Sequence, residues 1–226
     1  DLDVQTLFAE AMMDTNPWKL WSLDGTPAAG TEEIVATLEA VLAKDANHPG
    51  ANHYYIHAIE ASPHPEKAVP SAERLGALMP AAGHVVHMPA HIYYRVGQYR
   101  RSLDTNKLAV QVDEKYFAGS PSDPLYKSAY YPHNIHFVMV SAQMGGDGAT
   151  AIDAAKKLDA AVPAELAKQF QIMEPVKAAP YTTQLTFADP DAVLALAKPD
   201  EQLVLVRAMY HYARAIALAR KNDLAA

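Results

Sequence analysis

The stretch HVVHMPAH at residues 84–91 repeats the histidine spacing of the stretch HYYIH at residues 53–57. A shift of 34 residues carries the two histidines of the earlier stretch onto His87 and His91. Self-similarity at a fixed period of this size is typical of repeat proteins built from stacked helix-turn-helix units. The two stretches therefore predict an all-α fold in which histidines occupy equivalent positions of consecutive repeats.

The composition excludes several classes of partner and site. The chain has 226 residues, of which 50% are hydrophobic, and a formal net charge of -7 with Lys and Arg dispersed along it. Nucleic acids and anionic membranes both require a basic face, so we expect neither as a partner. Because no apolar run approaches the roughly 20 residues of a membrane-spanning helix, we expect a soluble protein without membrane insertion. The chain contains no Cys, so any metal must be bound by His, Asp, Glu or Tyr.

The beginning of the chain predicts two helices joined by a loop. An amphipathic pattern covers residues 3–14, and a cap with an acidic first turn begins a second helix at residues 31–44. Trp18 and Trp21 lie in the intervening segment 15–30, where we expect them to pack the loop onto the helices. The apolar side of the first helix is expected to contain Leu7, Phe8, Ala11 and Met12. Because the sequence opens already inside a helical pattern, we expect the chain to be a fragment or to have lost its natural N-terminus.

A third copy of the pattern follows at a shift of 49 residues, which carries Gly97 onto Gly146. The additional residues have a natural place in a segment rich in Gly, Ser, Pro and Asp, so we expect an insertion at about 117–131. Residues 164–200 contain four prolines and predict shorter, less regular helices. A final strong helix is expected at about 201–221, followed by a turn.

The turn after the second histidine stretch carries a family resemblance. Gly97, Tyr99 and Ser102 supply the glycine, aromatic and small residue of the turn between the two helices of a tetratricopeptide repeat. The chain resembles proteins of that family over residues 51–163 and more loosely outside them, although its first helices lack the usual Trp. The resemblance implies a right-handed α-solenoid forming a single domain over residues 1–226, whose concave wall generally binds peptides or partner proteins. The histidine stretches look like a bacterial branch of the family. The absence of Cys is compatible with both the bacterial periplasm and the cytoplasm, so the compartment stays open.

The resemblance also implies which side chains line the concave wall. The groove positions of the first, second and third copies are His53, His57 and Glu60; His84, His87, His91 and Tyr94; and His133 and His136. Helical spacing agrees, because residues three, four and seven apart share one face. Imidazoles from helices roughly 10 Å apart can meet at one ion, about 2 Å from each nitrogen. We therefore predict a metal site made of the seven histidines, for zinc, copper, iron or nickel rather than magnesium or calcium.

Several roles stay open at the level of sequence. Glu60 is either a ligand or a candidate catalytic acid/base facing metal-bound water, and whether the site is catalytic is undetermined. Tyr94 is a candidate for orienting a ligand, and Asn134 for supporting the histidines beside it. The spacing of the earlier histidine pair matches a zincin helix, but Tyr54 occupies the position of the general-base Glu, which argues against a peptidase of that type.

Two alternatives to a metal site remain. Repeats descend from duplication, so one structural histidine copied twice would give the same register, with buried imidazoles bonded to tyrosines and the main chain. The second alternative is a non-enzymatic scaffold that binds a peptide or partner protein in the same groove through His and Tyr.

Overall fold

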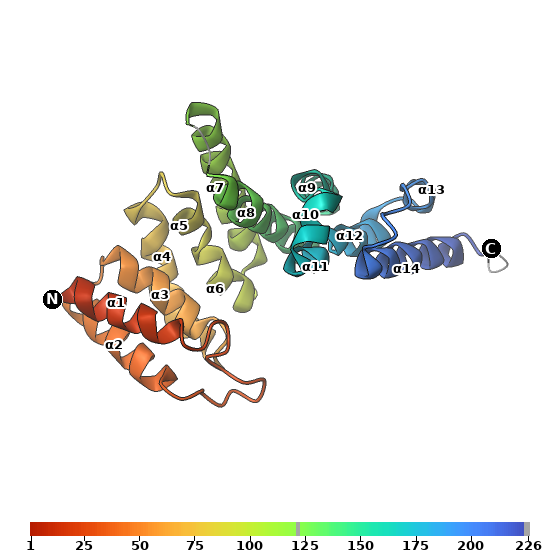
Figure 1. Ribbon diagram of the computed structural model, residues 1–226. Helices are drawn as coiled ribbons and strands as arrows, with labels where there is room; N and C mark the ends of the chain where they lie inside the picture. The colour runs from red at the N-terminus through yellow and green to blue at the C-terminus, as the bar shows by residue number, and fades with distance from the viewer. Residues whose placement is uncertain (121–122, 224–226) are drawn as a thin grey trace. The chain divides into compact units, whose positions relative to one another are not determined.

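The computed structural model describes residues 1–120 and 123–223. Within these ranges every regular element is a helix, as the repeat pattern predicted, and the one β-bridge joins Trp21 to Pro27. The chain forms two compact units, Asp1–Ala118 and Gly119–Ala226, whose elements are labelled in Figure 1. In the same ranges, no helix combines the length and apolar character needed to cross a bilayer.

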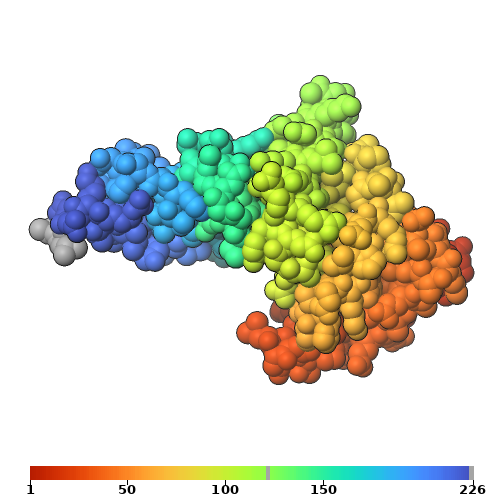
Figure 2. Space-filling view, turned by 180° about the vertical axis from the view of Figure 1, so that it is seen from behind, coloured from red at the N-terminus to blue at the C-terminus, as the bar shows by residue number. Residues whose placement is uncertain are grey.

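Unit 1 consists of helices arranged largely as sequential neighbours. They are α1 (Leu2–Met13), α2 (Thr31–Lys44), α3 (Pro49–Ile59), the 3₁₀ helix η1 (Pro65–Ala68), α4 (Val69–Leu78), α5 (Gly83–His87), α6 (Pro89–Arg95) and α7 (Tyr99–Gly119), whose last residue belongs to unit 2. α2 packs on α1 and α3, and α4 packs on α3 and α6. In the space-filling view, the orange to yellow atoms of these helices form one continuous surface (Figure 2).

Local chemistry explains where the first helices begin. The Asp1 carboxylate accepts the backbone N–H groups of two residues in the first turn of α1. At the start of α3, His48 Nδ1 accepts the backbone N–H of Ala51, and Pro49 occupies the first helical position, where its missing N–H costs nothing. The Nε2 atom of His48 also lies 3.1 Å from a carboxylate oxygen of Asp3, so this imidazole links α1 to α3. His48 therefore has a structural role.

The core of unit 1 lies between α2, α3, α4 and α6. Ile34 and Leu38 of α2, Ile56 of α3, Leu75 of α4 and Ile92 of α6 are at most 1% exposed and belong to one cluster. Burial of a side chain of this kind contributes roughly 1.5–3 kcal/mol, so α3 and α6 are held firmly where the histidine stretches lie.

Two expectations for the start of the chain were wrong. Trp21 packs as predicted, and its indole donates a 2.7 Å hydrogen bond to the carbonyl of Ala58 in α3, but Trp18 is 91% exposed. In α1 the buried residues are Thr6 and Ala9, whereas the predicted apolar residues Leu7 and Phe8 are exposed. A face of small residues lets α1 approach its neighbours closely. α1 therefore buries that face and leaves its larger apolar side chains exposed.

Unit 2 is built around a long helix pair followed by shorter helices. They are α8 (Pro124–Met144), α9 (Gly148–Ala161), α10 (Ala164–Gln169), the 3₁₀ helix η2 (Gln171–Met173), α11 (Glu174–Ala178), α12 (Pro180–Phe187), α13 (Pro190–Leu194) and α14 (Val204–Arg220). α9 packs on α8 and α12, while α14 packs on α11, α12 and α13. The short helices occupy the proline-rich stretch that was expected to be irregular. The residues assigned to an insertion fall at the end of α7 and the start of α8, except residues 121–122, which lie outside the described ranges.

Two turns that lie 49 residues apart in the sequence have the same backbone conformation and the same hydrogen bond. Gly97 follows α6 and Gly146 follows α8, with positive φ angles of 79° and 76°. The next residues, Gln98 and Asp147, each donate a backbone hydrogen bond to the carbonyl five residues earlier, at 2.7 and 2.9 Å. This left-handed ending is the usual way to stop a helix, and glycine adopts it at little cost. Asn222 ends α14 in the same conformation, with φ 58°, at the predicted final turn.

Candidate metal centre

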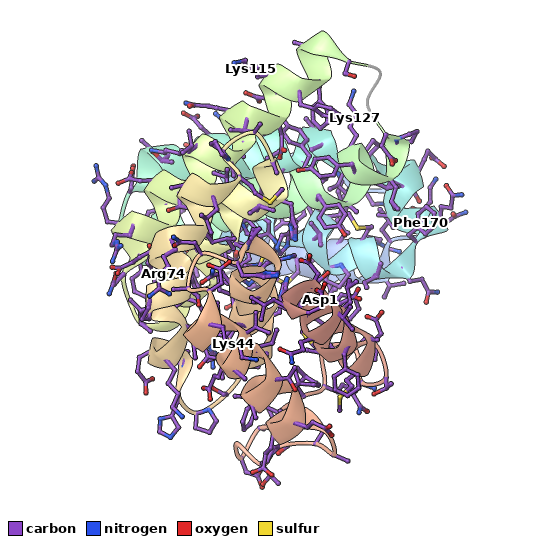
Figure 3. All side chains as sticks on the ribbon, turned by 90° about the vertical axis from the view of Figure 1, so that its left-hand side faces the viewer. Asp1, Lys44, Arg74, Lys115, Lys127 and Phe170 are labelled. Carbon is purple, nitrogen blue, oxygen red and sulfur yellow. The ribbon has the colours of Figure 1, made fainter. Side chains whose placement is uncertain are left out.

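Five histidines of unit 1 form one contiguous group of rings, which we call the imidazole cluster: His53, His57, His84, His87 and His91. α3 supplies the first two, α5 the next two and α6 the last. In Figure 3 nitrogen atoms gather in the interior of unit 1, between the orange and yellow ribbons. The sequence pattern therefore predicted correctly that the two histidine stretches meet.

The break between α5 and α6 does not disturb the histidine stripe. Met88 separates the two helices and keeps helical angles, with φ -50° and ψ -39°. Pro89 then occupies the first position of α6, where a helix tolerates the missing N–H. His84, His87 and His91 consequently continue along one face, as their spacing predicted.

Three imidazoles converge in a ligand-like arrangement. His53, His57 and His84 each offer a ring nitrogen, and these three atoms all lie within 4.8 Å of one another. The Nε2 atoms of His53 and His84 are 3.2 Å apart, and the centroids of these two rings are 5.1 Å apart. Zinc–nitrogen bonds are about 2.0–2.1 Å long, so two nitrogens on one ion lie at most about 4.2 Å apart, a limit that the His53–His84 pair meets as it stands.

A second pair of imidazoles adjoins this triad. His87 Nε2 and His91 Nε2 are 2.8 Å apart, with ring centroids at 4.7 Å. The ring of His87 lies 6.1 Å from that of His84, and the ring of His91 lies 5.6 Å from that of His57. His87 is completely buried, whereas His91 is 11% exposed.

Glu60 joins the two sets of imidazoles. This residue follows α3 directly, and its Oε1 lies 3.0 Å from Nδ1 of His57 while its Oε2 lies 2.5 Å from Nδ1 of His91. The carbonyl oxygen of Glu60 accepts a 2.8 Å hydrogen bond from Arg95 Nε, which fixes the backbone at this point. A carboxylate on the Nδ1 side of an imidazole directs the Nε2 lone pair toward a metal. This arrangement favours an orienting role for Glu60 over action as a base.

Asn106 of α7 is a site residue that the sequence reasoning missed. It is fully buried, and its Oδ1 lies 2.5 Å from Nδ1 of His87. Its amide nitrogen donates to the carbonyl of Ser102, one turn earlier, at 2.7 Å. The available signal was a polar residue on the small and apolar face of α7, where Ser102 and Ala109 are also buried.

Burial favours the neutral form of two imidazoles of the cluster, His53 and His84. Burial, followed by the neighbouring imidazoles, lowers the pKa of His53 from 6.5 to about 3. Burial and then the same kind of repulsion lower the pKa of His84 to about 4. Burial tends to raise the pKa of Glu60, but hydrogen bonds from His57 and His91 outweigh it and hold the pKa well below its ordinary value. Neutral imidazoles are the form that binds metals, so His53 and His84 are in their ligand form at neutral pH.

The other predicted site residues belong to α6 and α8. Tyr94 of α6 packs against Tyr99 with an edge-on ring contact at 5.3 Å. His133, Asn134 and His136 lie on α8 in unit 2; Asn134 is fully buried, and burial lowers the pKa of His136. Their participation in the metal site stays a prediction.

An ion bound by the triad would have room for a further ligand. Three imidazoles leave one position of a tetrahedral ion for water or an added molecule, which is the pattern of zinc sites with chemistry rather than purely structural ones. Neither a protein-family model nor a curated protein matches the chain.

Proposed function

We propose that this chain is a metal-binding protein in which His53, His57 and His84 hold a zinc, copper or iron ion. The observation that carries the proposal is the convergence of three ring nitrogens from two helices within 4.8 Å. Purely nitrogen donors favour these transition metals over magnesium or calcium, which prefer oxygen.

The proposal includes a solenoid of tetratricopeptide type as the scaffold. Two repetitions support it: the histidine spacing recurs after 34 residues, and the glycine turn at Gly97 recurs after 49 residues at Gly146. In that fold the first helices of the repeats line a concave wall, so α3 and the α5–α6 segment would present the site there. The scaffold sets the register that brings one histidine stretch against the next.

The support around the triad argues against a merely structural set of histidines. Structural imidazoles are expected to bond tyrosines or the main chain. His53 does stack on Tyr54, but its Nε2 also lies 3.2 Å from Nε2 of His84, and Nδ1 of His57 lies 3.0 Å from Glu60. Packing several basic rings together gains little unless a cation satisfies their lone pairs.

Elemental analysis of the full chain, prepared without chelator or affinity tag, tests the proposal. We expect zinc, copper or iron in the purified protein or after addition of the metal salt, and loss of the triad ion in His84→Ala. The matched control is His64→Ala, because His64 is 64% exposed and bonds Glu66 rather than the cluster. Less than about 0.2 metal per chain, with no uptake and no gain in melting temperature on adding zinc or copper, contradicts the proposal. A protein that binds a peptide through His87 without metal would then be the better description.

A further inference from the structure

The hydrogen bonds of Asn106 determine which nitrogen of His87 carries a proton. The Asn106 amide nitrogen faces the carbonyl of Ser102, which only accepts hydrogen bonds, so this nitrogen is the donor. The other amide atom, Oδ1, is therefore the acceptor that faces Nδ1 of His87 at 2.5 Å. Nδ1 of His87 therefore carries the hydrogen, and Nε2 is the ring nitrogen that faces His91.

Glu60 fixes His91 in the same form. An ionised carboxylate only accepts hydrogen bonds, so the Nδ1 atom of His91, 2.5 Å from Oε2, carries the hydrogen. The same reasoning applies to Nδ1 of His57 at Oε1. Both rings therefore direct their Nε2 atoms away from Glu60.

The consequence is a close approach of two Nε2 atoms. Nε2 of His87 and Nε2 of His91 are 2.8 Å apart, each on the side of its ring away from the group that holds Nδ1. Metal–nitrogen bonds of about 2 Å place adjacent ligand atoms roughly this far apart, so one ion can bind both atoms.

We propose that the imidazole cluster is a dinuclear centre, in which His87 and His91 bind a second transition-metal ion and Glu60 couples it to the first. The inference rests on the proposed function, because it presupposes the ion at His53, His57 and His84. Glu60 bonds one ligand of each ion, His57 and His91, and so acts as a positioning residue for both.

The ligand sets of the two ions are unequal. The first ion has three imidazoles from α3 and α5, whereas the second has the two imidazoles of His87 and His91 on one helical stripe. Two cations also repel each other across a small cluster, and the Glu60 carboxylate that contacts both ligand sets offsets only part of their charge. The ions should therefore bind in two steps, the second more weakly.

Zinc titration of the full chain tests the inference by calorimetry and native mass spectrometry. We expect two ions in the unmodified chain, one in His87→Ala, and one in His53→Ala. Because His87 is completely buried, His91→Ala serves as a second variant at a side chain that is 11% exposed, with circular dichroism to verify folding. Glu60→Gln should weaken both ions by about 10–100-fold. The control, Glu66→Gln, changes a carboxylate that is 60% exposed on His64 and should leave both ions unchanged.

Copper provides a spectroscopic measure of proximity. Two Cu²⁺ ions in adjoining sites should give a dipole-coupled electron paramagnetic resonance spectrum, which His91→Ala converts to that of an isolated ion. If the unmodified chain binds a single ion, and both His87→Ala and His91→Ala retain it, the second site is overturned and the proposed function stays intact. The short His87–His91 contact is then a hydrogen bond with a shared proton. Absence of any ion overturns both proposals. If Glu60→Gln weakens only one ion, the coupling is wrong even though two sites exist.

Discussion

Lowering the pH of the metal-free protein from 7 to 5 is expected to destabilise unit 1 through His53 and His84. Both groups have a pKa in the folded state below the ordinary value of 6.5, at about 3 and about 4. The unfolded chain therefore binds more protons than the folded chain once the pH falls below 6.5. Stability is then lost progressively until the pH reaches the folded-state pKa of each group.

The magnitude follows from the width of that window. Each histidine costs about 1.4 kcal/mol per pH unit below 6.5, so reaching pH 5 costs about 2 kcal/mol per group and up to about 4 kcal/mol for the two. Both folded-state pKa values lie below 5, so the loss at pH 5 does not depend on how far below they are. Glu60 does not offset this loss, because its pKa is lowered from 4.5 and its stabilisation disappears only below that pH.

Tryptophan fluorescence provides the assay. The chain has two tryptophans, and both belong to unit 1, where Trp21 bonds the carbonyl of Ala58 in α3. Urea unfolding followed by this signal, in the presence of a chelator at pH 7 and at pH 5, measures the difference directly. His53→Gln should lose about half of the pH dependence, whereas His64→Gln should keep all of it. Equal stability at the two pH values in the unmodified chain refutes the reasoning, as does a full drop in His53→Gln.

Three further test substitutions, two of them with a matched control, probe the support of the site and the fold. Asn106→Leu removes a buried acceptor and should cost about 1–3 kcal/mol in urea unfolding while weakening the second zinc ion; unchanged zinc stoichiometry and stability would contradict its assigned role. Trp21→Phe should cost about 1 kcal/mol through the lost indole hydrogen bond, and Trp18→Phe should cost nothing measurable because that side chain is 91% exposed; equal effects would contradict the difference in packing. Gly146→Ala should lower the thermal stability by about 1 kcal/mol through backbone strain alone, since a Cβ meets nothing within 4 Å, whereas Gly119→Ala lacks the positive φ and should not. Loss of stability in neither glycine variant would argue against the left-handed turn.

The sequence predicts helices well where local chemistry specifies both ends. The expected helix at residues 31–44 is α2, Thr31–Lys44, with the predicted acidic first turn, but the predicted cap was wrong: the N-cap is Gly30, and the Thr31 hydroxyl bonds the carbonyl of Leu20. Periodicity did not identify the buried face of α1, where Thr6 and Ala9 are buried and Leu7 is 58% exposed. The buried face depends on how closely neighbouring helices pack, which the pattern of a single helix does not contain.

The candidate site was predictable to a similar extent. Repeat spacing brought His53 and His57 to the correct helix face and next to His84. The spacing also predicted that Glu60 lies beside these histidines. It did not predict that Glu60 contacts both His57 and His91, because those contacts depend on side-chain rotamers on two helices. Asn106 lies on a helix that contributes no histidine to the cluster, so no spacing pattern connected it to His87.

An anomalous-difference map from crystals grown with zinc, recorded at the zinc absorption edge, tests the central claim most directly. The account predicts one peak about 2.0–2.1 Å from ring nitrogens of His53, His57 and His84, and a second, weaker peak at Nε2 of His87 and His91. Peaks only at surface carboxylates or exposed histidines, with none in the imidazole cluster, would contradict it.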